Sequence, residues 1–227
     1  ELRRLLEAQP WVANEADDLG VFVLMFAATG GCVAAAELLL EFGADLHAKN
    51  PINWSVLLYA ALGNHAPMVD FLIGKGAEVT SHELILAAYT GNPKSLESLL
   101  KHYRGTVQEI RTDTSEKTLL HLACEGLCFL RHTAERHAEC VRLLLQYKVP
   151  VDAVDPKQGR TCMQDFVGDV RWHTRGFEDS VAHMAVLDEL CSNGADVAVE
   201  DFQGHSALSI ATDAGLMRVR ELLFSYR

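Results

Sequence analysis

A short pattern of residues returns along this chain at intervals of roughly 33 residues. Its clearest copy begins at Thr118 and reads Thr-Leu-Leu-His-Leu-Ala-Cys, and the leucine triplet Leu143-Leu144-Leu145 follows it. Other copies share a pair of alanines and a glycine-alanine-acid ending, at Ala27-Ala28, Ala60-Ala61, Ala87-Ala88, Gly43-Ala44-Asp45, Gly76-Ala77-Glu78 and Gly194-Ala195-Asp196. A unit this short cannot bury its apolar face alone, so neighbouring units must stack on one another.

The repeated segments resemble the ankyrin repeat, whose signature contains Thr-Pro-Leu-His-x-Ala ahead of two short helices. The resemblance extends over nearly the whole chain and implies a single domain over residues 1–227. The implied fold class is an all-α repeat solenoid, in which stacked helix pairs are joined by short β-hairpin connections. We expect a partial unit, one trailing helix, over residues 1–17 and repeats at approximately 18–50, 51–80, 81–112, 113–154, 155–200 and 201–227.

The copies also differ from the family pattern. None keeps the proline of the signature, and Phe22 replaces its threonine in the first repeat. Asp18 and Asp201, with Gly20 and Gly204 two and three residues after them, are expected to supply turn chemistry for the projecting hairpins. The unit near Ser81 lacks most of its hairpin residues, and we expect a groove to be exposed there.

Composition limits the partners and the compartment. The formal net charge of −11 at pH 7 disfavours nucleic acid and anionic lipid, and it favours a neutral or basic protein or peptide. The longest apolar block, residues 21–28, is far too short to span a bilayer, so we expect no membrane insertion. No signal-peptide pattern opens the chain, and we expect a monomer in the reducing cytoplasm.

The six cysteines do not have the pattern of a disulfide framework. Cys32, Cys124, Cys140 and Cys191 stand where the repeat packs a small apolar residue. We therefore expect these four to be buried free thiols.

The densest cluster of metal-ligating residue types comprises His121, Cys124, Cys128, His132, His137 and Cys140. On an uninterrupted helix, offsets of three and four residues would put four of them on one face, and zinc favours such ligands. Four of the six, however, occupy regular repeat positions where packing explains them, so we predict no metal. Phosphate-loop and nucleophile-elbow patterns are absent from the sequence. We predict a non-enzymatic chain without cofactors; the alternative is a regulatory or substrate-recruiting domain of a larger enzyme.

Three segments interrupt the repeat, at residues 103–117, 125–136 and 168–180. Insertions in repeat proteins map to loops on one face and often take part in recognition. Phe129 and Trp172 lie in the latter two segments. Each aromatic residue either fastens its insert to the stack or contacts a partner.

The resemblance implies that a partner is recognised by hairpin tips and by the surface of the first helices, on the concave face. At the matching positions the first repeats carry apolar and aromatic residues, which predict the main binding surface: Leu19, Val21, Ile52, Trp54, Leu62 and Tyr89. A secondary surface comprises Phe129, Arg160, Trp172 and His205. Alternatively, Ile52 and Trp54 cover the shortened unit near Ser81. A recognition role predicts that Trp54→Ala weakens binding and barely changes thermal stability.

The two ends of the sequence resemble interior parts of a stack. The opening residues 2–6 resemble a second helix without its first, and residues 222–227 carry no polar cap of the kind that terminal repeats need. We expect the sequence to be part of a longer protein.

Overall fold

The computed structural model describes residues 1–129, 134–169 and 180–227, and of Cys128 and Phe129 only the backbone. The regular secondary structure of the described residues is helical apart from isolated β-bridges, so the all-α repeat fold is confirmed. They separate into two compact units. The first comprises Glu1–Ala87 and Lys94–Arg104, and the second comprises Ala88–Pro93 and Gly105–Arg227. A single domain with the repeat boundaries given above stays a prediction.

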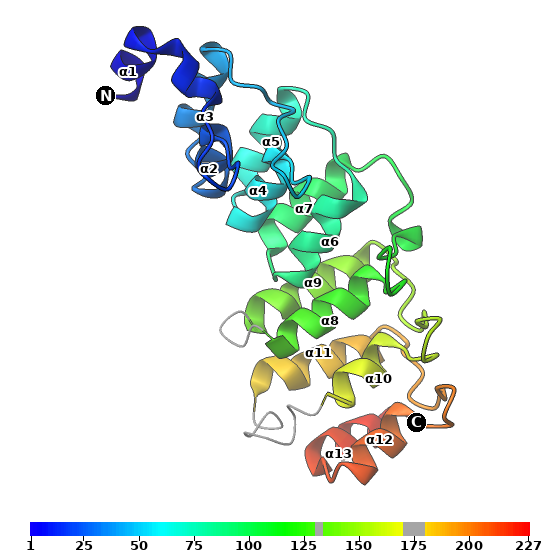
Figure 1. Cartoon of the computed structure of the whole chain (residues 1–227). Helices are drawn as coiled ribbons and strands as arrows, with labels where there is room; N and C mark the ends of the chain where they lie inside the picture. The colour runs from blue at the N-terminus through cyan, green and yellow to red at the C-terminus, as the bar shows by residue number, and fades with distance from the viewer. Residues whose placement is uncertain (130–133, 170–179) are drawn as a thin grey trace. The chain divides into compact units, whose positions relative to one another are not determined.

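The helices up to residue 102 are short and follow one another closely (Figure 1). Their bounds are α1 Leu2–Ala8, η1 Pro10–Asn14, α2 Val23–Thr29, α3 Val33–Glu41, α4 Val56–Gly63, α5 Ala66–Gly74, α6 Ser81–Tyr89 and α7 Pro93–His102. The expected single helix over residues 1–17 is wrong. It is interrupted between α1 and η1 because Pro10 lacks a backbone N–H and cannot continue the first helix.

The later helices repeat the same alternation. Their bounds are η2 Val107–Glu109, α8 Leu119–Phe129, α9 Ala134–Gln146, α10 Cys162–Val167, α11 Val181–Ser192, α12 Ala207–Asp213 and α13 Met217–Ser225. The insert expected over residues 125–136 is shorter than predicted, because α8 and α9 extend into it from both sides. The insert expected over residues 168–180 lies between α10 and α11, as predicted.

Within each unit, helices pack with their sequence neighbours and with their equivalents in the next pair. In the first unit α2 contacts α3 and α4, and α3 contacts α5. In the second unit α8, α10 and α12 contact in sequence, as do α9, α11 and α13 (Figure 1). Small residues such as Ala28 and Ala60 are fully buried and allow close approach. Leucines such as Leu39 and Leu72 fill the space between pairs, and full burial of each contributes about 1.5–3 kcal/mol.

Hairpins precede the first helix of most pairs, as the family resemblance implied. Each is held by a single antiparallel bridge, at Ala16↔Phe22, Lys49↔Ser55, Arg111↔Thr118, Val154↔Thr161 and Glu200↔Ser206. In the first hairpin the turn is held by Asp17 and not by Asp18 as expected. The Oδ1 atom of Asp17 accepts hydrogen bonds from the backbone N–H groups of Leu19 at 2.9 Å and Val21 at 2.8 Å.

The connection between α5 and α6 is different. It spans only residues 75–80, whereas residues 42–55 connect α3 to α4. None of the bridges found in the described residues falls within this short connection. The third helix pair therefore has no projecting hairpin, as its sequence predicted.

Candidate binding groove

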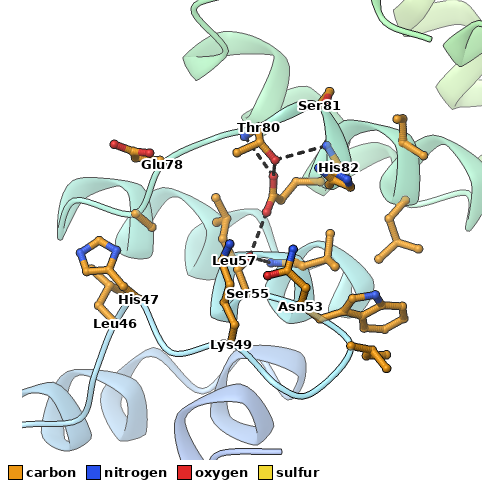
Figure 2. Close-up of a pocket in the computed structure, with 17 residues that line it drawn as sticks. Leu46, His47, Lys49, Asn53, Ser55, Leu57, Glu78, Thr80, Ser81 and His82 are labelled. Carbon is orange, nitrogen blue, oxygen red and sulfur yellow. Dashed lines mark hydrogen bonds between the residues drawn. The ribbon is translucent and has the colours of Figure 1, made fainter. Parts of the chain in front are cut away.

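A groove of about 670 Å³ lies in the first unit, beside the short connection between α5 and α6. We call it the hairpin groove (Figure 2). One wall is the second hairpin and the start of α4, and the other is the connection itself and the first two turns of α6. Its lining residues are Leu46, His47, Lys49, Ile52, Asn53, Trp54, Ser55, Leu57, Leu58, Ala77, Glu78, Thr80, Ser81, His82, Glu83, Ile85 and Leu86.

The hairpin wall is held rigidly by Asn50, which is buried. Its Oδ1 atom accepts hydrogen bonds from the backbone N–H groups of Ile52 at 3.1 Å and Trp54 at 2.9 Å. Its side-chain nitrogen donates to the Tyr59 hydroxyl at 3.0 Å. Asn53 sits at the turn with φ 65°, a left-handed conformation that asparagine tolerates better than most residues. The tip is thus pre-shaped before any partner arrives.

The opposite wall is organised by the buried carboxylate of Glu83, which is 3% exposed. Its Oε2 accepts from the Thr80 backbone N–H at 3.0 Å and from the Thr80 hydroxyl at 2.6 Å. Its Oε1 accepts from the Ser55 hydroxyl at 2.9 Å (Figure 2). Ser55 in turn caps α4 by accepting from the backbone N–H of Leu58 at 3.0 Å. Glu83 therefore joins two adjacent helix starts where a hairpin would otherwise lie.

The groove brings together only two of the residues expected to bind a partner, Ile52 and Trp54. Ile52 is 64% exposed, and Leu19 on the first hairpin tip is 75% exposed. The two hairpin tips approach each other, because a Cβ atom on Gly20 would lie 2.5 Å from Cδ of Pro51. Val21 and Leu62 are half-buried and do not line the groove.

Tyr89 belongs to the second unit and is half-buried there. Its backbone carbonyl accepts a hydrogen bond from Nε2 of His137 at 3.0 Å. Its membership of one binding surface with the hairpin-tip residues stays a prediction.

The Trp54 side chain is more buried than its position on a hairpin tip suggested. It is half-buried, and its ring lies edge-to-face on Tyr59 with the ring centroids 5.8 Å apart. It therefore contributes both to the groove and to the packing of the second hairpin.

Sequence reasoning missed Glu83, which lines the groove, and Phe26, an exposed aromatic residue outside the groove lining. Phe26 on α2 is 56% exposed, yet its helical repeat position made it resemble a core residue. Glu83 was not among the residues predicted to bind a partner. The spacing Thr80-x-x-Glu83 is that of a capping box, a signal that could have identified its role.

Two protein-family descriptions match the chain. "Ankyrin repeats (3 copies)" matches residues 2–83, and "Ankyrin repeat" matches residues 115–156. The chain belongs to the ankyrin-repeat family.

Two curated proteins that are similar to this chain are much longer than it is. The chain is 26% identical to the nuclear factor NF-kappa-B p105 subunit of Gallus gallus, over 98% of this chain and 22% of that protein. It is 32% identical to the Caenorhabditis elegans homolog of transient receptor potential cation channel subfamily A member 1, over 55% of this chain and 10% of that protein. The chain thus spans a small part of the length of both relatives.

Solved ankyrin structures share the fold. The human ASB11 ankyrin repeat domain matches with a TM-score of 0.70 and 22% identity, covering 100% of this chain and 97% of that one. The ankyrin repeat domain of Bcl-3, a member of the IkappaB protein family, matches with a TM-score of 0.68 and 25% identity, over 93% and 87%. A chain from the complex of the Bdellovibrio bacteriovorus endopeptidase Bd0816 with immunity protein Bd3460 matches with a TM-score of 0.64 and 21% identity. The match covers 94% of this chain and 100% of that one.

A histidine near the start of the second helix has a packing role in these ankyrin repeats, at His137 in the first turn of α9 and at His65 just before α5. His137 is fully buried, and a Cβ atom on Gly91 or Gly126 would lie 2.4 Å or 2.6 Å from its ring. His65 occupies the same repeat position and lies equally close to Gly31. These close approaches explain why glycine faces each histidine.

His121 also has a structural role. Its Nδ1 lies 2.8 Å from the Thr118 hydroxyl, and its Nε2 lies 3.0 Å from the Arg160 carbonyl oxygen. Cys128 and His132 of the predicted cluster lie outside the described side chains. Among the side chains that are described, no group of three or more histidine, cysteine or acidic residues is arranged to hold a metal ion.

The expected thiol positions are mostly correct. Cys124, Cys140 and Cys191 are buried, whereas Cys32 is exposed. The expectation for Cys32 is wrong because it lies at the start of α3, outside the packed face. Burial raises the pKa of Cys191 to about 11 and raises that of Cys140 further, which keeps both thiols protonated.

The secondary surface is described only in part. Phe129 and Trp172 have side chains outside the described residues. The Arg160 guanidinium is 2.9 Å from the buried Asp201 carboxylate, so its charge is already paired. His205 lies near the same carboxylate, with Nδ1 3.8 Å from Oδ1, and stays partly exposed. Binding by either residue stays a prediction.

Within residues 1–129, 134–169 and 180–227, no helix combines the length and apolar character needed to cross a membrane.

Proposed function

We propose that this chain is a non-enzymatic protein–protein interaction module that binds a peptide or a folded protein on its concave surface, with the hairpin groove at the centre. Ankyrin-repeat domains generally act as protein interaction modules. The observation that carries the proposal is the hairpin groove itself. A missing hairpin leaves an apolar hollow, and Ile52 projects beside it with most of its side chain exposed.

The construction of the groove favours binding over mere packing. Asn50 and Glu83 hold its two walls by hydrogen bonds that need no partner. Preorganised walls reduce the ordering cost of association. Ile52, Trp54 and Leu86 offer the apolar area from which interface anchors are built.

The same proposal covers the oligomeric state, the compartment, the absence of catalysis and the absence of nucleic-acid binding. It acts as a monomer in the cytoplasm, carries no catalytic activity of its own and does not bind nucleic acid. The net charge of −11 supports the last point, because phosphate backbones repel an acidic surface.

Site-specific photocrosslinking tests the proposal. A photoreactive amino acid at Ile52 should crosslink a small, reproducible set of polypeptides in an extract of the source cells. The matched control carries the photoreactive amino acid in place of Val181 on α11. This apolar position is 85% exposed and remote in sequence from the groove. An excess of unmodified chain should suppress crosslinking from Ile52, and an excess of an Ile52→Asp chain should not. Equal suppression by both, or the same polypeptides captured from Val181, would place binding elsewhere.

A further inference from the structure

The ionisable residues of the hairpin groove point to the chemistry of its occupant. Three charged side chains line it, Lys49, Glu78 and Glu83, together with two exposed histidines. Lys49 and Glu78 are exposed and therefore solvated, whereas Glu83 is almost completely buried. A charge is felt most strongly where water is excluded, so Glu83 dominates the electrostatics of an occupied groove.

Glu83 has hydrogen-bond donors but no cationic partner among the described residues. Its three bonds come from the backbone N–H and hydroxyl of Thr80 and the hydroxyl of Ser55, all of them neutral. Buried carboxylates are usually paired with a cation, because desolvation of an unpaired charge is costly. Its Oε1 accepts one hydrogen bond only, which leaves acceptor capacity on that atom.

Resting on the function proposed above, we propose that the hairpin groove takes a peptide segment with a lysine or arginine side chain beside a large apolar residue. The cationic group lies against Oε1 of Glu83, and the apolar side chain packs against Trp54 and Leu86. Occupation of the groove by this pair removes water and strengthens the attraction. Lys49 lies on the same lining and repels the incoming cation, so it limits the affinity.

A positively charged occupant agrees with the net charge of the groove lining and of the whole chain. The groove lining is net negative when its histidines are neutral, since it carries Glu78 and Glu83 against Lys49. The whole chain is also acidic, at −11. An acidic occupant would bring a second carboxylate towards Glu83 in a site from which water is excluded.

Selection from a displayed library of random twelve-residue peptides tests this inference. We expect peptides selected on the full chain to be enriched in lysine or arginine next to a large apolar residue. Individual peptides should bind Glu83→Gln about tenfold more weakly, since the change removes the charge and keeps an acceptor. Lys49→Gln should bind them about threefold more tightly. Glu37→Gln, which removes an exposed carboxylate of α3, should bind like the unchanged chain, and matching melting temperatures establish that each variant is folded.

The possible outcomes separate the two proposals. The cation inference is overturned if the selected peptides lose binding to Ile52→Asp but lack basic residues. It is also overturned if the peptides bind Lys49→Gln more weakly than the unchanged chain. Either outcome leaves the groove as the binding site. If no selected peptide depends on Ile52, both the inference and the proposed function of the groove are wrong.

Discussion

At the scale of single residues, the two ring nitrogens of His121 have partners that decide which of them carries the proton. The Arg160 carbonyl can only accept a hydrogen bond, so Nε2 must donate to it, and Nδ1 then accepts from Thr118 in the neutral ring. Burial lowers the pKa of His121 below its ordinary value of 6.5, although the hydrogen bond to Arg160 opposes this effect. The folded chain thus holds His121 neutral.

This lowered pKa predicts acid sensitivity. Below about pH 6.5 the unfolded chain binds a proton at His121 before the folded chain does, so the stability provided by the neutral ring is lost as pH falls. Denaturant unfolding at pH 7.5 and pH 5.5 should show a smaller free energy of unfolding at the lower pH. His121→Gln should reduce that difference, whereas His47→Gln, at an exposed histidine, should leave it intact. An unchanged pH dependence in His121→Gln would contradict the assignment.

Trp54 and Ile52 are expected to differ in their effect on stability. Trp54→Ala removes an edge-to-face contact with Tyr59 and half-buried surface, so it should cost about 1–2 kcal/mol of unfolding free energy. Ile52→Ala changes a mostly exposed side chain and should stay within about 0.5 kcal/mol of the unchanged chain. Urea unfolding of both variants checks the difference. A stable Trp54→Ala would restore the view that this residue serves recognition alone.

At the scale of elements, Glu83 replaces a hairpin in holding the start of α6. Its carboxylate satisfies the N–H of Thr80 at the helix start and links it to Ser55 at the start of α4. We expect Glu83→Ala to destabilise the chain by about 1–3 kcal/mol, because buried donors lose their acceptor. Glu83→Gln should cost less. Hydrogen exchange should show the loss first in the amides of α6, and Glu37→Ala should show no such change; a uniform loss over all helices would contradict a local role.

The elements show which parts of the fold are readable from sequence. The repeated alanine pairs and leucines predicted the helix pairs, because each pair meets the same packing requirement. The short connection before Ser81 predicted a groove, since absent residues cannot fill space. The interruption at Pro10 was also visible in the sequence, but the periodic apolar pattern on either side concealed it.

The site was less predictable than the fold for a physical reason. Repeat position indicates which side chains point away from the core, but not which of them converge. Ile52 and Trp54 were found because they lie on a hairpin tip. Glu83 was missed because its importance arises from a hydrogen bond with the Ser55 hydroxyl, 28 residues away in the sequence. Phe26 was missed because its exposure depends on how neighbouring helices leave it uncovered.

At the scale of the whole molecule, charge acts over a limited range. The net charge of the chain repels phosphate backbones, but the screening length of about 8 Å at physiological ionic strength confines this repulsion to the neighbourhood of the surface. Inside the hairpin groove the local balance of Lys49, Glu78 and Glu83 decides the preference instead. The sequence-level expectation of a neutral or basic partner and the cation inference therefore agree, but for different reasons.

The metal content of the whole chain is the last expected outcome. A zinc ion in the fourth repeat would have to displace the Thr118 and Arg160 partners of His121 and the Tyr89 carbonyl that His137 contacts. It would also need a thiolate from Cys140, whose pKa is raised by burial. Elemental analysis after gentle purification should therefore find well under one zinc per chain, and a chelator should leave the melting temperature unchanged. One zinc per chain, lost together with stability in Cys128→Ser, would show instead that metal binding holds this repeat together.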